Sequence, residues 1–162
     1  MLLRATRTVA FVVALAATQA HTNPADGGVT LDATVETSSG STTRLSALWA
    51  KPTVLFYEDR DSTALNQHVK DALYEKGKTE HMLDQVSVVA VANVAAYDWF
   101  PARNFVLAAV RDVEKKVHLP VYLDFKGSLA TAPWNLPPKS STVLVLDGSG
   151  PVVTASSPHR PP

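Results

Sequence analysis

The order of apolar segments constrains the fold of this 162-residue chain more than any other feature. Residues 53–57 (TVLFY) form a continuous β-branched and aromatic run, and residues 86–94 (VSVVAVANV) form a second one. Such runs are typical of interior strands that are covered on both faces. A segment with helical spacing follows each run. This alternation of strand and helix predicts an α/β fold with parallel pairing and right-handed crossovers.

Each helical segment is expected to bury one apolar stripe. The first stripe consists of Leu65, Val69 and Leu73, with Ala64, His68 and Ala72 beside it. The second consists of Phe105, Ala109, Val113 and Val117. Either Ser62 or Thr63 is expected to cap the first helix, and Gly77 to end it. Pro101 suits the first turn of the second helix.

Further strands are expected on both sides of this alternating region. Apolar residues at every second position from Val29 to Val35 predict a half-buried strand, and the Ser/Gly turn at residues 38–40 makes it the first strand of a hairpin. VYLDF after Pro120 predicts a further strand. TVLVLD and VVT, joined by a Gly-Ser-Gly turn, predict a final antiparallel pair. We therefore expect one domain over residues 29–154.

The two ends of the chain differ in character from this domain. Residues 1–20 place Arg4 and Arg7 before a short apolar run and end in ATQA, which is the pattern of a cleavable secretory signal. The alternative is a retained anchor, although the run is far shorter than the roughly 20 residues that span a bilayer. Residues 21–28 are expected to be a flexible lead-in, and residues 155–162 a disordered Pro-rich tail. We expect export to the periplasm or beyond, and no stable membrane span after signal cleavage.

Composition excludes several classes of function. The chain is 46% hydrophobic and 19% charged, which suffices for a genuine core. Its 15 basic and 15 acidic residues would become 13 and 15 after signal removal, a formal net charge of −2. No cluster of Lys and Arg indicates a nucleic-acid partner. The absence of cysteine excludes thiol chemistry, so the fold is held by its core alone.

These residues resemble the thioredoxin-like superfamily, in particular its exported peroxiredoxin-like branch. The resemblance rests on an N-terminal hairpin, on Lys51-Pro52 before VLFY and a charged corner, on VYLDFKG, and on SSTVLVLDGSG. The segment WNLPPKSSTVLVLD is most similar to the small periplasmic proteins called YtfJ-like. The resemblance covers about residues 29–154. It implies a thioredoxin-like fold with a central mixed sheet, the hairpin and flanking helices.

The chain departs from this family pattern at three places. Residues 61–64 (DSTA) stand at about the position of the family's C-x-x-C, so neither attacking nor resolving sulfur exists. Ser141 stands where the family has a cis-proline. The terminal helix is apparently missing, because only eight residues follow Thr154. Either the N-terminal segment or a partner then covers the last strands, or the reading frame is truncated; these explanations remain open.

The charged corner Glu58-Asp59-Arg60-Asp61 is the first candidate site. It follows a buried strand and precedes a helix, where α/β folds concentrate function and where backbone N–H groups favour anions. In the simpler interpretation, Asp61 caps the helix and Arg60 pairs with a neighbouring carboxylate. In the other, the corner is a binding edge that lost its sulfur chemistry. Because Ser141 replaces the cis-proline of the family, it is included in this candidate site.

Aromatic residues form the second candidate site. Tyr97 and Trp99 follow the second buried strand, and Trp134 lies in a Pro-rich loop. Rings with polar handles line binding surfaces, but they also anchor loops onto a core. Metal binding is not expected, because no histidine pair has ligand spacing and each histidine is interpreted as partly buried. No cofactor is expected.

The function that follows is a contact role. We expect a redox-inactive binding or scaffold module with a protein partner in the cell envelope. The alternative is a cysteine-free hydrolase or metal-dependent enzyme that uses Asp61, Ser62 and His68. Such a triad needs a nucleophile, a base and an orienting acid within hydrogen-bond reach, and the chain has no G-x-S-x-G motif.

Overall fold

A computed structural model describes residues 30–157 of the chain. The expected signal (residues 1–20) and lead-in (residues 21–28) lie outside the described residues. The strands are β1 (Thr34–Glu36), β2 (Thr42–Arg44), β3 (Thr53–Glu58), β4 (Ser87–Asn93), β5 (Val121–Asp124), β6 (Thr142–Leu146) and β7 (Val152–Ser156). The helices are α1 (Gln67–Thr79) and α2 (Ala102–Val117), with short 3-10 helices η2 (Leu45–Leu48), η3 (Met82–Asp84) and η4 (Ala95–Tyr97).

The strands form one mixed sheet in the order β2-β1-β5-β4-β3-β6-β7. The three inner strands β5, β4 and β3 are parallel, and β6 pairs antiparallel with β3. The β1–β2 hairpin and the β6–β7 hairpin form the two edges. The expected central mixed sheet with an N-terminal hairpin and flanking helices is therefore confirmed.

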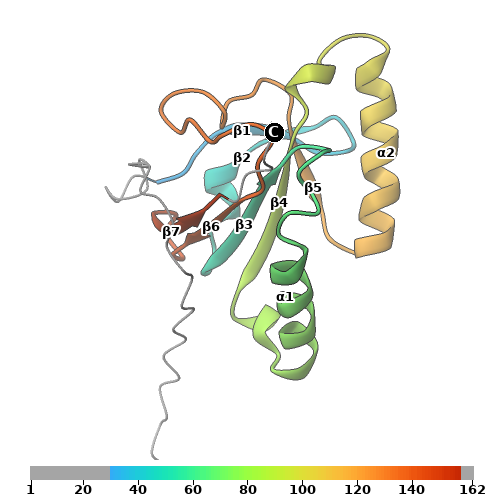
Figure 1. Cartoon of the computed structure of the whole chain (residues 1–162). Helices are drawn as coiled ribbons and strands as arrows, with labels where there is room; N and C mark the ends of the chain where they lie inside the picture. Colours follow the sequence, from blue (N-terminus) through green and yellow to red (C-terminus); the bar gives the residue numbers. More distant parts are fainter. Residues whose placement is uncertain (1–29, 158–162) are drawn as a thin grey trace, which may run out of the picture.

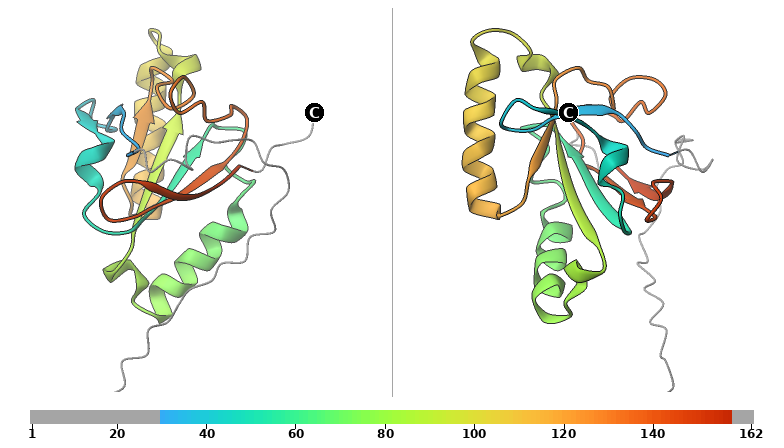
Figure 2. Two further views of the ribbon diagram at one scale, coloured as in Figure 1. Left: turned by 90° about the vertical axis from the view of Figure 1, so that its left-hand side faces the viewer. Right: turned by 180° about the vertical axis from the view of Figure 1, so that it is seen from behind.

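Both helices lie on the same side of the sheet (Figures 1 and 2). Two successive right-handed crossovers, from β3 to β4 and from β4 to β5, advance in the same direction and therefore place α1 and α2 on one face. No residue of either helix is buried. Neither helix has an apolar stretch long enough to cross a membrane.

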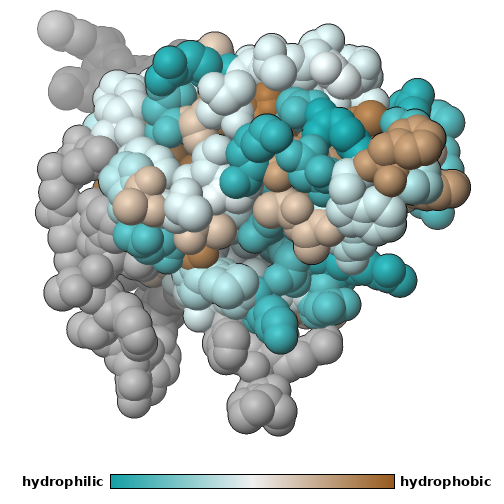
Figure 3. Space-filling view, turned by 90° about the horizontal axis from the view of Figure 1, so that it is seen from above, coloured by the Kyte–Doolittle hydropathy of each residue, from teal (hydrophilic) through white to brown (hydrophobic). Residues whose placement is uncertain are grey.

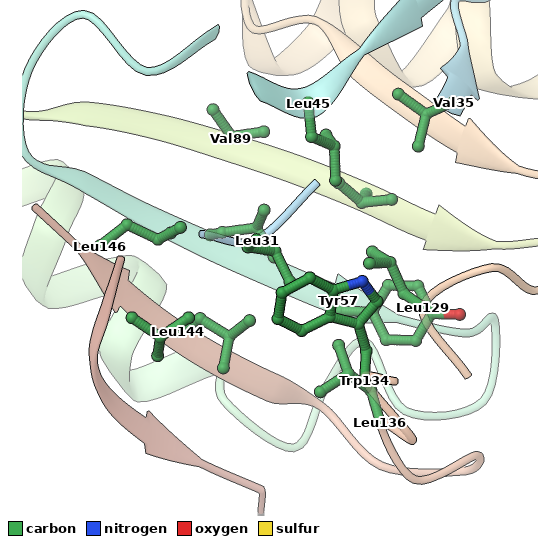
Figure 4. Close-up of a cluster of buried hydrophobic side chains, with 13 residues drawn as sticks. Leu31, Val35, Leu45, Tyr57, Val89, Leu129, Trp134, Leu136, Leu144 and Leu146 are labelled. Atoms are coloured by element: carbon green, nitrogen blue, oxygen red, sulfur yellow. The ribbon is translucent and has the colours of Figure 1, made fainter. Parts of the chain in front are cut away.

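The main core lies on the opposite face, which has no α-helix in the described residues. It is covered by the segment around η2 and by the loop between β5 and β6 (Figure 4). Its buried members are Leu31, Val35, Leu45, Leu55, Tyr57, Val89, Val91, Leu129, Trp134, Leu136, Leu144, Leu146 and Val152. Because side chains alternate along a strand, Leu55 and Tyr57 face this core while Phe56 and Glu58 face the helices.

The apolar stripe expected on α2 is wrong. Phe105, Val113 and Val117 are 71%, 45% and 49% exposed. The residues that pack against the sheet are instead Val106, Leu107 and Val110. Positions four apart advance by more than one turn of 3.6 residues, so a long run of them winds around the helix and cannot all face one sheet.

Helix α1 also differs from the expectation. It begins at Gln67 rather than beside Ser62, and it continues past Gly77 to Thr79. Leu65, Val69 and Leu73 are only half-buried, and His68 is exposed rather than partly buried. The reason is that α1 lies near one end of the sheet and covers little of it (Figure 2).

The end of the domain extends beyond its expected boundary. Strand β7 continues through Ser156, two residues into the segment expected to be a disordered tail, and no helix follows it within residues 30–157. The surface of the last strands that the missing terminal helix would leave uncovered is limited to β7, where Val153 is 66% exposed. Strand β6 is buried at four of its five positions.

Candidate functional site

Strand β3 ends at the charged corner and presents two polar side chains to opposite faces. Tyr57 faces the main core, where its hydroxyl donates to Asp124 Oδ2 at 3.1 Å. Asp124 is fully buried and also accepts the backbone N–H groups of Ser128 and Leu129, at 2.8 and 3.0 Å. Burial and the neighbouring Asp124 carboxylate raise the pKa of Tyr57, so this tyrosine stays neutral.

Glu58 faces the other side and lies in a buried polar cluster. Its carboxylate accepts from Ser141 Oγ and from Lys70 Nζ, the latter at 2.7 Å. Asn66 Nδ2 donates to the carbonyl and to the Oγ of Ser141, at 2.6 and 2.9 Å. Glu58, Asn66 and Ser141 are 9%, 4% and 0% exposed. We call these four residues, Glu58, Asn66, Lys70 and Ser141, the sealed corner.

Asp59 fastens the following turn to the rest of the molecule. Its Oδ1 accepts the backbone N–H groups of Asp61 and Ser62, at 3.1 and 3.0 Å. Its Oδ2 accepts the backbone N–H of Lys139 at 2.7 Å, which joins the corner to the loop before β6. Ser62 Oγ in turn accepts the N–H of Asp59 at 3.0 Å. Asp59 is therefore an acceptor for backbone groups of two separate segments.

These bonds explain why the expected helix capping is wrong. Ser62 and Asp59 bond to each other, so residues 60–66 form successive turns instead of the first turn of a helix. The N-cap position belongs to Asn66, whose side chain makes no capping bond because it donates to Ser141. Asp61 does not cap α1, since it lies several residues before Gln67.

Only part of the predicted charged corner reaches the surface. Arg60 and Asp61 are exposed, and Asp59 is half-buried. The ion pairs of residues 30–157 do not include Arg60, so the expected pairing of Arg60 with a neighbouring carboxylate is wrong. Glu58 pairs instead with Lys70. The corner thus presents one free basic and one free acidic side chain outside a closed polar interior.

The aromatic residues that follow β4 form a second surface at the same end of the sheet. Trp99 and Phe100 are 59% and 83% exposed, and Tyr97 is half-buried against the smaller core under α2. The indole of Trp99 donates to the carbonyl of Ala96 at 3.2 Å, which fixes the ring. We call Trp99, Phe100 and Phe105 the aromatic surface. Figure 3, which views this end, shows apolar side chains gathered over α2.

A charged network centred on Asp98 adjoins Trp99 of the aromatic surface in the sequence. Asp98 accepts from Arg103 at 2.6 Å and from Lys126 at 2.7 Å. Arg103 also donates to Glu36 and lies over the ring of Phe125, 3.9 Å from its centroid. The hydrogen bond from Lys126, followed by that from Arg103, lowers the pKa of Asp98. This network ties β1 and α2 to the residues that follow β5.

Trp134 is buried, although the sequence alone does not decide between a binding surface and a loop anchor for this residue. It is 6% exposed in the main core, and its indole donates to the carbonyl of Asp32 at 3.3 Å (Figure 4). Its ring anchors the loop between β5 and β6 over the sheet. Of the two interpretations of this residue, the loop anchor is the one that matches its burial.

The alternative enzyme site does not assemble. Ser62 is 1% exposed with its Oγ bonded to the Asp59 backbone, whereas His68 and Asp61 are exposed and share no hydrogen bond with it. A nucleophile needs a base within hydrogen-bond reach and access for substrate. Within residues 30–157, no group of three His, Asp or Glu side chains is placed to hold a metal ion.

Sequence reasoning missed two of the four residues of the sealed corner, Asn66 and Lys70. Their spacing of four places them on neighbouring turns at the start of α1, which is a usable local signal. The approach of Ser141 has no such signal, since it lies 75 positions from Asn66 and 83 from Glu58.

Neither family models nor curated proteins match this sequence. Solved structures do match its fold. The pneumococcal exposed lipoprotein thioredoxin of Streptococcus pneumoniae is 20% identical with a TM-score of 0.57, and the alignment covers 81% of this chain and 92% of that one. A putative thiol:disulfide interchange protein DsbE of Chlorobium tepidum is 17% identical with a TM-score of 0.56, covering 82% and 84%.

A third similar structure is named a peroxidoxin, whereas the first two are named a thioredoxin and a thiol:disulfide interchange protein. The peroxidoxin BcpB of Mycobacterium tuberculosis is 22% identical with a TM-score of 0.51, and the alignment covers 80% of this chain and 84% of that one. At these identities the similarity concerns the fold alone. Together with the mixed sheet, it shows that residues 30–157 have the thioredoxin-like fold.

Proposed function

We propose that this is an exported thioredoxin-like protein without thiol redox activity, which acts through contacts as a binding or scaffold module of the cell envelope. The observation that carries the proposal is the sealed corner in a chain that has no cysteine. The sealed corner flanks residues 61–64, where the family resemblance puts a reactive thiol pair, and every buried side-chain N and O atom of the described residues is hydrogen-bonded. A fully satisfied buried polar cluster rigidifies a structure.

The surface around the sealed corner supports the contact role. Arg60 and Asp61 are exposed on one side, and the aromatic surface lies next to the adjoining strand end. Exposed aromatic and Arg side chains are enriched among the residues that dominate protein–protein binding. We therefore assign the contact surface to these residues rather than to the buried Glu58 and Ser141.

Export rests on two supports. The residues at the start of the chain follow the secretory-signal pattern. One similar structure is named an exposed lipoprotein thioredoxin. The segment from Trp134 to Asp147, through its resemblance to YtfJ-like proteins, favours the periplasm.

The first experiment asks whether the protein turns over any substrate. Metal-free protein is assayed for insulin reduction, peroxide consumption and ester hydrolysis, with a thioredoxin and an esterase as positive controls. We expect background rates in all three assays. Robust turnover in any of them contradicts the binding-module proposal.

The second experiment uses the absence of cysteine to map the contact surface. An Arg60→Cys variant carries a single thiol for a photo-crosslinker, and Lys78→Cys, at the far end of α1, is the matched control. We expect one envelope protein to be captured through residue 60, to be competed by unlabelled wild type, and to be absent with residue 78. Equal capture at both positions would refute the assignment of the surface.

A further inference from the structure

A groove lies at the end of the sheet opposite the sealed corner, where the parallel strands β4 and β5 begin. Its volume is about 320 Å³, and it is open to solvent. Pockets for small ligands begin at about this size and are mostly apolar, with a few polar groups. The groove fits that description, because its walls are largely apolar, with Leu48, Leu83, Val89 and Leu119 among them.

Three polar side chains interrupt this apolar lining, Lys51, Ser87 and Tyr122. They come from neighbouring strands of the sheet: Lys51 precedes β3, Ser87 begins β4, and Tyr122 belongs to β5. The hydroxyls of Ser87 and Tyr122 make no hydrogen bond within residues 30–157. Since no buried side-chain oxygen of these residues lacks a partner, both hydroxyls are open to solvent. They are therefore available to a ligand.

Lys51 is the one charged residue of the lining. Its ammonium donates to the carbonyls of Leu83 and Asp84, at 3.0 and 3.3 Å. Because an ammonium has three N–H groups, one of them is left for a ligand. Lys51 is half-buried and does not occur among the ion pairs of residues 30–157. A half-buried cation without an acidic partner attracts a negatively charged group.

The acidic side chains around the groove do not supply that partner. The side chain of Asp84 is 80% exposed. The carboxylate of Glu114 accepts the backbone N–H of Val121 and the hydroxyl of Ser38. Burial, followed by the charge of Glu114, raises the pKa of Tyr122. The Tyr122 hydroxyl therefore keeps its proton at neutral pH and can donate it in a hydrogen bond.

We propose that the groove binds a small monocarboxylate with an apolar chain. The carboxylate accepts the free N–H of Lys51 and a hydroxyl of Ser87 or Tyr122, and the chain lies against the apolar walls. One positive charge matches one negative charge, whereas a phosphate dianion would leave a charge without a partner. The groove is separate from Arg60, Asp61 and the aromatic surface, so the inference does not rest on the proposed contact role.

Sodium octanoate is the probe for this site, titrated into the isotope-labelled full chain and followed by two-dimensional NMR. We expect saturable shifts centred on residues 48–51, 83–89 and 119–122, with a dissociation constant at or below about 1 mM. Octan-1-ol has the same chain without the charge and should bind about tenfold more weakly. Hexanoate should bind about sixteenfold more weakly than octanoate, because each buried CH₂ changes the dissociation constant about fourfold.

Variants of the polar groups test their roles in the site. Lys51→Gln should weaken octanoate binding about tenfold and leave octan-1-ol binding unchanged, so that the two ligands bind alike. Lys139→Gln is the matched control, because it removes the same charge from an exposed lysine at the other end of the sheet. It should leave both affinities unchanged. Ser87→Ala combined with Tyr122→Phe should weaken octanoate binding several-fold.

Three results would each overturn the inference. The first is the absence of saturable shifts at the groove when octanoate far exceeds the expected dissociation constant. The second is equal binding of octanoate, octan-1-ol and octylamine, which would make the groove an unselective apolar surface. The third is a change at the same residues on dilution of the protein alone, which would assign the groove to a second copy of the chain. All three are measured on the wild type, so they stand even if Lys51→Gln does not fold.

Discussion

Strands β3 and β4 end side by side in the sheet, with Glu58 opposite Ala92, yet the two ends are built in opposite ways. At the end of β3, Glu58 lies under Lys70, Asn66 and Ser141 with its hydrogen bonds made inside the protein. At the end of β4, the rings of Trp99 and Phe100 lie in solvent. The comparison teaches that a polar strand end can be structural while the apolar one beside it is available for contacts.

The cause of the difference is the loop that crosses each end. The loop before β6 brings Ser141 onto Glu58 and Lys139 onto Asp59, and thereby closes the end of β3. After β4, the charged residue Asp98 turns inward to Arg103 and Lys126, which leaves the neighbouring aromatic rings outside. In both cases the charged groups that are not exposed, among them Glu58 and Asp98, are satisfied within the protein. What remains for a partner is the exposed pair Arg60 and Asp61 and the aromatic surface.

Replacement of Glu58 should have the largest effect on stability. Glu58→Ala leaves the buried hydroxyl of Ser141 without its acceptor and Lys70 with only the carbonyl of Thr63, and we expect a loss of about 2–3 kcal/mol in unfolding free energy. The lower end of the usual range applies because the Lys70 side chain is 28% exposed and stays partly hydrated. Urea denaturation measures the change.

Two further variants at this corner control for that effect. Arg60→Ala, on the exposed side of the corner, should stay within about 0.5 kcal/mol of wild type. Glu58→Gln keeps an acceptor for Ser141 and should fall between the two. An unchanged midpoint for Glu58→Ala would show that the corner is not structural.

Tyr57→Phe should have an intermediate effect that depends on pH. Loss of the bond to buried Asp124 should reduce stability at pH 7 by about 1–2 kcal/mol. The pKa of Tyr57 is raised in the folded protein, so its contribution is complete below the unfolded pKa of about 10 and is lost as pH rises further.

Denaturation from pH 7 to 11 measures this dependence. The stability difference between wild type and Tyr57→Phe should therefore shrink above pH 10. A difference that grows in that range would contradict the inferred direction of the shift. Tyr97→Phe, which removes a hydroxyl without a hydrogen bond in the described residues, should change stability little at pH 7.

Trp99→Ala should have the smallest effect on stability and the clearest effect on contacts. Its ring is 59% exposed, so we expect a change within about 0.5 kcal/mol. Crosslinking of the envelope partner through residue 60 should nevertheless decrease several-fold.

The second tryptophan of the candidate site is the matched control. Trp134→Ala removes a ring that is 6% exposed in the main core, and it should cost about 3–5 kcal/mol. If Trp99→Ala destabilises the protein as much as Trp134→Ala does, the aromatic surface is structural and the distinction between the two strand ends disappears.

The comparison also marks the limits of sequence reasoning about this site. The strand that ends at Glu58 and the aromatic run after residue 94 are both local patterns, and both lie where they were predicted. The exposure of each residue is not a local property. Trp99 and Trp134 have similar surroundings in the sequence, next to a proline or two residues from one, yet one is exposed and the other is in the core.

What the sequence by itself determined is the succession of strands and helices and the absence of sulfur chemistry. The buried runs at residues 53–57 and 86–94 and the paired hairpins follow from spacing that any short window shows, because strand and helix periods are local. The lack of cysteine requires no structure at all.

Only the tertiary structure decided which face holds the main core, which side of α2 faces the sheet and which candidate residues are closed off. The main core lies under loops because Leu129, Trp134 and Leu136 return across the sheet face that the helices leave free. The corner is closed because Ser141 meets Glu58 across 83 positions. Contacts between distant segments arise from the path of the whole chain, and no periodicity within either segment encodes them.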